Sequence, residues 1–281
     1  EELRKVIPSF LKRVDAPERG GAWSAYLERN RVVMEEVASS LFGRDEPEPR
    51  PSVTLVDFDA DAEEKLVAAM LYPYTHLPED QVLARVRRMS PEEKVAVVEA
   101  YAGERENRRH RPGRALERTA YRFDVLSDYG AFRDLQRHRM LTIEWQELTP
   151  RHGYVVPEAV IQAGHQEGFE ESLARSAELH DLLVRSFPAQ SGYAVCLAFR
   201  VRYVMQMNAR EAMHMLELRS GPQGHPEYRR IAQEMHRLVD EQAGHHAVAA
   251  LMRHVDHGTY DLERLDAERR AAARRAARTT P

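Results

Sequence analysis

Two short stretches of the chain concentrate side chains that could bind an anion. The first is the triplet Arg137-His138-Arg139, in which two guanidinium groups flank an imidazole. Guanidinium groups recognise phosphate and carboxylate through paired hydrogen bonds. The triplet could therefore bind a polyanion. By itself it is weak evidence, because the pattern recurs at Arg109-His110-Arg111 in a chain with 37 arginines.

The second stretch begins at Asn208-Ala209-Arg210 and continues to His214, Leu218 and Arg219. On a helix, positions 210, 214 and 218 lie one above another on one face, with 219 beside them. Asn208 can cap the start of this helix, where exposed backbone amides favour an anion. A capped helix with a solvated arginine face would give the same pattern, so this stretch alone does not establish a site.

The elements that must position these residues form an α+β arrangement, helix-dominated and with a small sheet. Apolar periodicity predicts helices over 23–41, 61–71, 79–89 and 92–101, and a strand at Val53–Phe58. Ser90, Pro91 and Glu93 give a good helix start. Residues 103–113 form a basic loop. Alternation then predicts a strand over 119–125.

The second half supplies the elements around both stretches. We expect a short helix over 128–137, an extended segment over 140–147 and a long helix over 158–187. Alternating apolar residues from Val195 to Tyr203 predict a strand whose other face carries Arg200 and Arg202. Helices follow over 208–219 and 226–257, the latter interrupted near Gly244. The tail after Asp261 is charged.

Composition limits the class of protein. The formal net charge of −4 gives the whole molecule no attraction to nucleic acid or acidic membranes. The single cysteine, Cys196, excludes an internal disulfide and is expected to be buried and inert. No apolar stretch approaches the ~20 residues that a membrane span needs. We expect a cytoplasmic protein, and because the chain starts at Glu1 rather than Met we expect part of something larger.

Taken together, the two stretches resemble the flavin-dependent thymidylate synthases. That family has an Arg-His-Arg triplet after a helix and a later Asn-Ala-Arg helix ending in Leu-Arg, here Leu218-Arg219. The segment 117–125 looks like the family's Glu-led strand, and the resemblance spans about residues 52–260. The run from Gly221 to Pro226 and the later Gly244-His245 resemble a diverged branch of this family. A protein built from tandem copies of the domain is one alternative for that branch.

The resemblance implies roles for individual residues. Arg137, His138 and Arg139 would bind FAD, and Arg137 would also contact substrate. Asn208, Arg210 and His214 would face the flavin, with His214 standing where the family has asparagine. Arg219 would contact the pyrimidine and favour ionisation of its ring nitrogen, the catalytic role; a guanidinium suits this because it stays charged.

The chain also departs from the family pattern, mainly in the half that binds the nucleotide. Glu147 stands at the family's serine in the substrate site, where a carboxylate would repel a phosphate. Asp134 replaces a glutamine, and Gly192 falls where an arginine should grip the nucleotide. The Gly-His-x-Ser element is absent, with Pro112 at its histidine. The residues expected to bind the flavin match the family pattern better than those expected to bind the nucleotide.

The resemblance implies a helix-rich fold with a small central antiparallel or mixed sheet. It implies methylation of dUMP to dTMP with methylenetetrahydrofolate, FAD and NADPH, in a homotetramer. Two alternatives stay open: a diverged, non-catalytic FAD-binding or structural module, and an arginine-rich protein that binds nucleic acid or a partner. We expect residues 1–50 to be a helical extension, 51–260 the family domain and 261–281 a charged tail. No metal site is expected, because His245, His246, His254 and His257 lack a metal-binding spacing.

Overall fold

The computed structural model describes residues 1–260, 265–266, 268–270 and 272–273. The chain divides into two compact units, Glu1–Pro49 and the part from Arg50 onward. Most of the charged tail expected at 261–281 lies outside the described residues. Within the described residues, each helix is too short or too polar to cross a membrane.

The first unit consists of three helices, α1 (Glu2–Val6), α2 (Pro8–Leu11) and α3 (Gly21–Phe42). Helix α3 confirms the prediction over 23–41, and it ends at Gly43 as the sequence indicates. None of its residues is buried.

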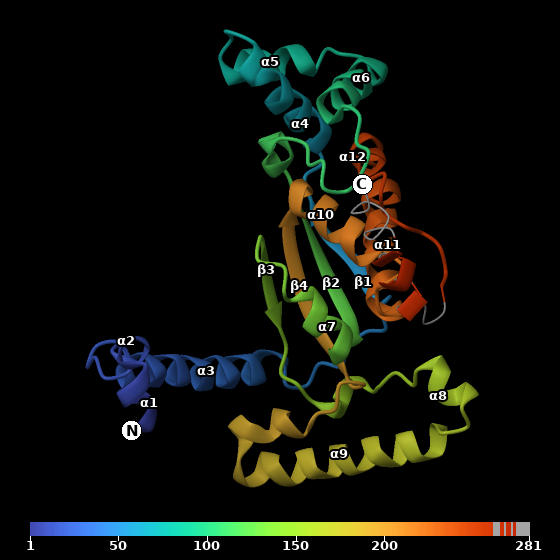
Figure 1. Cartoon of the computed structure of the whole chain (residues 1–281). Helices are drawn as coiled ribbons and strands as arrows, with labels where there is room; N and C mark the ends of the chain where they lie inside the picture. The colour runs from blue at the N-terminus through green and yellow to red at the C-terminus, as the bar shows by residue number, and fades with distance from the viewer. Residues whose placement is uncertain (261–264, 267, 271, 274–281) are drawn as a thin grey trace. The chain divides into compact units, whose positions relative to one another are not determined.

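The second unit is built on a four-stranded antiparallel sheet in the order β1-β2-β4-β3 (Figure 1). The strands are β1 (Val53–Phe58), β2 (Ala120–Asp128), β3 (Leu141–Trp145) and β4 (Arg200–Asn208). Strands β2 and β4 pair along their full length, so Ala120 faces Asn208 at one end and Asp128 faces Arg200 at the other. This register brings the Asn-Ala-Arg stretch to the end of the sheet where β2 begins.

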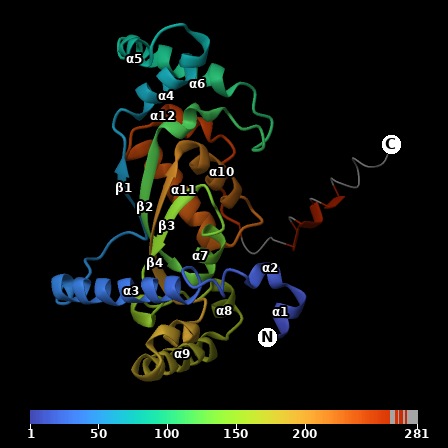
Figure 2. The ribbon, with the colours of Figure 1, turned by 90° about the vertical axis from the view of Figure 1, so that its left-hand side faces the viewer.

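Side-chain alternation gives the sheet two different faces. Tyr121, Phe123, Val201, Tyr203 and Met205 are fully buried on one face. Helices α7 (Tyr129–Leu135), α10 (Ala209–Arg219), α11 (Pro226–Glu241) and α12 (His246–Leu251) lie on one side of the sheet (Figures 1 and 2). The opposite face carries polar cross-strand contacts, such as Arg202 Nη1 to Asp124 Oδ1 at 2.8 Å. The predicted outward position of Arg200 and Arg202 is confirmed.

A group of helices precedes β2 at one end of the sheet. They are α4 (Ala62–Leu71), η1 (Tyr72–Tyr74), α5 (Glu79–Val86) and α6 (Pro91–Ala102), followed by η2 (Arg114–Arg118). Ser90 and Glu93 form a reciprocal capping box at the start of α6, as the sequence predicts.

Three predictions were wrong in detail. The single helix expected over 158–187 is two helices, α8 (Glu158–Gln162) and α9 (Gln166–Ser186), because Gly164 adopts a φ of 71° between them. The strand expected from Val195 begins only at Arg200, because residues 195–199 form a loop after the 3-10 helix η4 (Pro188–Ala194). Cys196 therefore lies in a loop and is exposed, not buried. Another 3-10 helix, η3 (Pro150–His152), follows β3.

Candidate functional site

The triplet 137–139 follows the short helix α7, which starts with a cap. Asp128, the last residue of β2, accepts a hydrogen bond from the backbone N–H of Ala131 at 2.8 Å. The helix ends at Leu135, and the triplet lies in the segment that leads to β3. His138 is buried between Arg137 and Arg139, which are both exposed.

The second stretch forms the junction of β4 and α10. Asn208 caps α10, accepting a hydrogen bond from the backbone N–H of Glu211 at 2.9 Å, as the sequence predicts. Helical spacing then places His214 one turn beyond Glu211 on the same face, and Arg219 at the end of the helix.

A buried carboxylate connects the two stretches. Glu211 Oε1 lies 2.8 Å from His138 Nδ1, and Glu211 Oε2 lies 3.3 Å from His214 Nδ1. Burial opposes ionisation of Glu211, but the hydrogen bonds from both histidines outweigh it and lower the pKa of this carboxyl to about 2. Glu211 is therefore ionised at neutral pH.

Arg219 completes the connection from the other side of His138. Its Nε donates to His138 Nε2 at 3.1 Å, and its Nη2 donates to the backbone oxygen of Asp134 at 2.6 Å. Because an arginine can only donate, His138 Nε2 accepts and the ring carries its proton on Nδ1, toward Glu211. Asp134 Oδ1 also accepts from Arg219 Nη1 at 3.4 Å. Arg219 is thus held in one orientation by the end of α7 and the triplet that follows it.

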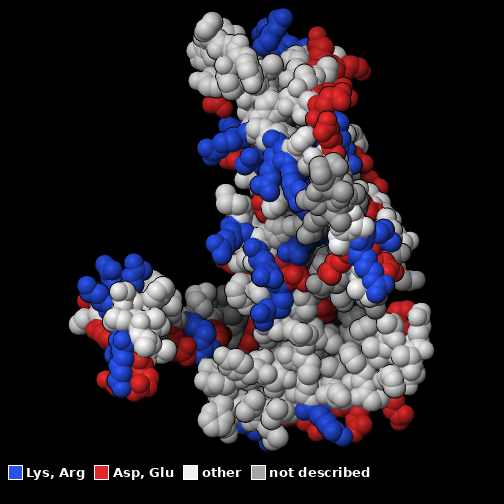
Figure 3. Space-filling model, viewed as in Figure 1, with Lys and Arg blue, Asp and Glu red and all other residues white. Residues whose placement is uncertain are grey.

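These side chains border a cavity of about 280 Å³. Its lining residues are Arg111, Arg137, His138, Arg139, Met140, Glu211, His214, Leu218 and Arg219. Across the described residues, Arg111, Arg137 and Arg139 have no carboxylate or other polar partner. Figure 3 shows Lys and Arg side chains gathered over α10 and β3 on this side of the unit. Unpaired guanidinium groups around one cavity give it a positive charge, which attracts anions.

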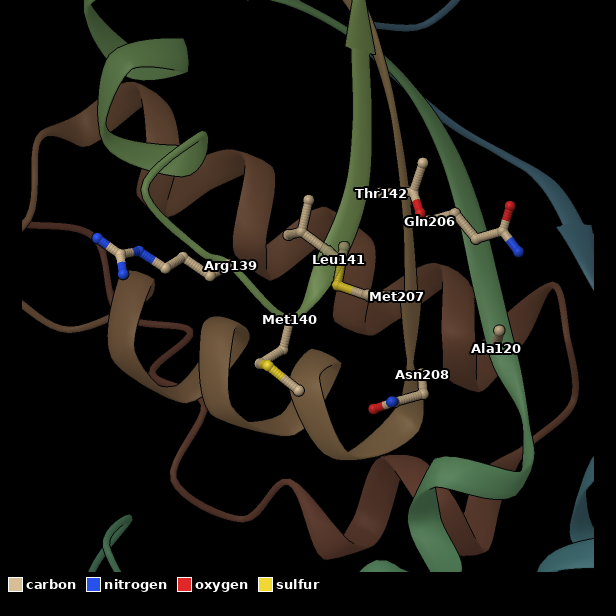
Figure 4. Close-up of a pocket in the computed structure, with 8 residues that line it drawn as sticks. All are labelled: Ala120, Arg139, Met140, Leu141, Thr142, Gln206, Met207 and Asn208. Carbon is tan, nitrogen blue, oxygen red and sulfur yellow. The ribbon is translucent and has the colours of Figure 1, made fainter. Parts of the chain in front are cut away.

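A second cavity of about 390 Å³ adjoins the first, since Arg139 and Met140 line both. It is lined further by Ala120, Leu141, Thr142, Gln206, Met207 and Asn208. Figure 4 shows Asn208 at the start of α10 with the Met140 side chain near it, and Arg139 extending the other way. The two cavities thus offer an apolar part next to an arginine-rich part.

The structure brings together most, but not all, of the predicted site residues. Arg137, His138, Arg139, His214 and Arg219 surround the first cavity, and Asn208 borders the second.

Two predicted residues line neither cavity. Arg210 donates to Glu117 Oε1 at 3.3 Å and to the backbone oxygen of Pro112 at 3.2 Å, so its charge is already paired. Glu147 is exposed on the segment after β3.

Two residues at the cavity were missed in the sequence. Glu211 directly follows the Asn-Ala-Arg stretch and stands three residues before His214, a spacing that puts the two side chains in contact on a helix. Arg111 belongs to the second Arg-His-Arg triplet, at residues 109–111. The sequence predicts no site there, because a second copy of the triplet suggests that such triplets occur by chance. The basic character of its loop was the available signal.

His138, Glu211 and His214 also have the composition of a metal site. Their ligand atoms lie within 4.8 Å of one another. The guanidinium of Arg219 donates to the outer nitrogen of His138, and three further arginines border the same cavity. This positive surrounding disfavours a divalent cation, and we assign the cluster to hydrogen bonding that orients His138.

Comparison with known proteins identifies what this arrangement is similar to. Residues 54–244 match the family model Thy1, thymidylate synthase complementing protein. A UPF0159 protein of Chlamydia muridarum is 35% identical over 275 residues, which are 97% of this chain and 51% of that protein. A UPF0159 protein of Thermoplasma acidophilum is 34% identical over 272 residues, covering 95% of this chain and 52% of that protein. The chain spans about half the length of these relatives.

Solved structures share the fold. A UMP/dUMP methylase, PolB from Streptomyces cacaoi bound with 5-Br dUMP, has a TM-score of 0.56 at 18% identity, covering 70% of this chain and 94% of that one. The flavin-dependent thymidylate synthase ThyX from Helicobacter pylori, complexed with FAD and dUMP, has a TM-score of 0.52 at 16% identity, covering 73% and 100%. The predicted α+β fold with a small antiparallel sheet is confirmed.

Proposed function

The chain belongs to the Thy1 family of flavin-dependent thymidylate synthases, and we propose that it binds FAD and dUMP at the arginine-lined cavities and methylates dUMP to dTMP. Methylenetetrahydrofolate would donate the one-carbon unit and NADPH the reducing equivalents. The proposed domain is 51–260. The homotetramer that the resemblance implies and the cytoplasmic location expected from the composition belong to the same proposal.

The observation that carries the proposal is the set of three unpaired guanidinium groups, on Arg111, Arg137 and Arg139, around one cavity. This donor set fits a phosphate-bearing cofactor, because arginine forms paired, charge-assisted hydrogen bonds with phosphate oxygens. The adjoining cavity, with Met140, Leu141 and Met207, offers apolar surface for a ring system. The residues present therefore fit FAD better than they fit a metal ion.

The chain's own residues would position the ligands and stabilise charge. Bound FAD would supply the redox chemistry, which no side chain provides. His138 is held by Glu211 and accepts from Arg219, so the guanidinium is fixed before a ligand arrives. Such a preorganised cation can stabilise negative charge that develops on a pyrimidine ring. Arg219 is the proposed catalytic residue, and Arg137, Arg139, Asn208 and His214 are the proposed flavin contacts.

One observation favours a second candidate, a non-catalytic FAD-binding module of the same fold. Glu147 lines neither cavity. A Cβ atom added at Gly192 would contact only Leu148. The two positions that should hold the nucleotide thus contribute no cation. Arg219 also already donates hydrogen bonds to the backbone and carboxylate oxygens of Asp134.

Two experiments separate these candidates. Purified chain incubated with FAD and passed through a desalting column should retain the flavin absorbance under either proposal. Chain loaded with FAD should then release tritium from dUMP labelled at C5 when methylenetetrahydrofolate and NADPH are added. Retained FAD without tritium release would support the non-catalytic module, and no retained FAD would reject both.

A further inference from the structure

The loop between α6 and η2, residues 103–113, contributes Arg111 to the lining of the first cavity. It leaves α6 at Gly103, whose φ of 58° turns the chain. Within the loop, the Asn107 side-chain oxygen accepts from the backbone N–H of Arg109 at 2.9 Å, and the Asn107 amide lies 3.2 Å from His110 Nε2. These contacts give an irregular segment a defined shape.

Arg105 anchors this loop in the protein interior. Its side chain is 1% exposed and forms two 2.7 Å hydrogen bonds with the carboxylate of Glu217, whose side chain is also 1% exposed. Arg105 also donates to the backbone oxygens of Leu251, at 2.6 Å, and of His110, at 2.7 Å. The buried guanidinium therefore ties the loop to α10 and to the end of α12.

The bond to His110 matters because the next residue, Arg111, lines the first cavity. Arg105 fixes the backbone immediately before Arg111, and its partner Glu217 lies on α10 two residues before Arg219. Arg111 itself is exposed, with no polar partner among the described residues. A buried ion pair thus holds an unpaired cation at the cavity's edge.

We propose that Arg111 is a phosphate-binding residue, which joins Arg137 and Arg139 around one phosphate group, and that Arg105 is the positioning residue that holds Arg111 there. This inference rests on the proposed function for the identity of the ligand. It would also supply a cation for phosphate that Gly192 and Glu147 do not. The phosphate could come from the flavin or from the nucleotide.

The energetics favour a directional role for the buried Arg105–Glu217 pair over a purely stabilising one. Burying two charges carries a large desolvation cost, and well-packed apolar groups often stabilise a fold equally well. An arginine does what an apolar side chain cannot: it bonds at once to the Glu217 carboxylate and to two backbone oxygens. Such a directional anchor sets the position of Arg111, which a charge-assisted bond to phosphate requires.

The test compares Arg111→Ala with Arg108→Ala, an exposed arginine of the same loop that does not line either cavity. Binding of pyrophosphate, FAD, riboflavin, dUMP and deoxyuridine is measured by calorimetry or flavin fluorescence. We expect Arg111→Ala to weaken pyrophosphate binding about tenfold, the effect of one charge-assisted hydrogen bond. Arg108→Ala should leave it within about twofold.

The phosphate-free probes identify the source of the phosphate. Weaker FAD binding with unchanged riboflavin binding assigns Arg111 to the flavin. Weaker dUMP binding with unchanged deoxyuridine binding assigns it to the nucleotide. Equal losses for phosphate-bearing and phosphate-free probes would overturn the proposal, as would wild-type affinity in Arg111→Ala.

The outcomes separate this inference from the proposed function. If the chain binds FAD and dUMP, and Arg111→Ala weakens neither of them nor pyrophosphate, the inference is overturned and the function stands. Wild-type chain that binds pyrophosphate through Arg111 but neither FAD nor dUMP would overturn the function and support the phosphate site. No affinity for any phosphate-bearing probe would overturn both.

Arg105 is tested with the double variant Arg105→Met/Glu217→Met, which removes both buried charges together. A positioning role predicts weaker pyrophosphate binding in this variant at a temperature where it is fully folded, with unchanged riboflavin binding. Wild-type pyrophosphate affinity in the folded double variant would overturn the positioning role. Arg105→Lys, which keeps one charge, should recover part of the affinity.

Discussion

Nδ1 of His138 lies 2.8 Å from Oε1 of Glu211, although the two residues are 73 positions apart in the sequence. This contact joins the triplet after α7 to the first turn of α10. It places the proton of His138 on the side of Glu211 and leaves the other ring nitrogen to accept from Arg219. One buried carboxylate thereby orders three groups of the proposed site.

Replacing Glu211 with glutamine should destabilise the fold. The amide has nearly the shape of the carboxylate but no charge, so the hydrogen bonds from His138 and His214 weaken. We expect a loss of about 1–3 kcal/mol in the free energy of unfolding, measured by urea denaturation at pH 7. Glu144→Gln, at an exposed position on β3, is the control. Equal stability of the two variants would show that the network contributes nothing.

The same carboxylate predicts a dependence of stability on pH. Its pKa is lowered from an ordinary value of 4.5 to about 2 in the folded chain. Since the folded form holds the proton less tightly, the contribution is complete above about pH 4.5 and is lost as pH falls toward 2. The stability difference between wild type and Glu211→Gln should shrink over this window. A difference that stays constant from pH 7 to pH 3 would contradict the assignment.

In the proposed function, Asp134 would compete with an anionic ligand for Arg219. Asp134→Asn should keep the backbone contact to Nη2 while removing the negative charge near Nη1. Because the Asp134 side chain is 41% exposed, the gain is modest, about twofold to fivefold tighter binding of dUMP in calorimetry. Asp80→Asn, an exposed change on α5, should have no effect. Weaker dUMP binding by Asp134→Asn would reverse the interpretation.

The buried pair of Arg105 and Glu217 should behave differently from exposed pairs. Arg105→Met leaves the Glu217 carboxylate unpaired and buried, which costs about 3–5 kcal/mol of unfolding free energy. Adding Glu217→Met should restore part of that loss. Arg237→Met, which removes an exposed partner of Glu234, should change stability by about 0.5 kcal/mol or less. A single variant as stable as the double variant would contradict the burial of this pair.

Local signals in the sequence predicted the elements of the fold well. The capping residues Ser90 and Asn208 and the strand Val53–Phe58 all lie where the sequence indicates. The errors arise where one backbone conformation overrides an apolar pattern. Gly164 breaks an otherwise helical stretch with a positive φ, and the apolar run before Arg200 forms a turn and a loop.

The site was only partly predictable for a physical reason. Motif order identified the triplet and α10, but not which charges the fold would neutralise. Arg210 pairs with Glu117, so it is withdrawn from the cavity, whereas Arg111 is brought to the cavity by the anchor at Arg105. Both outcomes depend on contacts between residues far apart in the chain.

Titration of the chain with FAD, followed by flavin fluorescence, tests the central claim most directly. We predict saturable quenching by the wild-type chain and at least tenfold weaker binding by Arg137→Ala/Arg139→Ala. Arg237→Met, which alters an exposed arginine on α11, should bind FAD as the wild type does. Flavin fluorescence that stays unchanged with a folded wild-type chain would contradict the assignment of these cavities to a flavin.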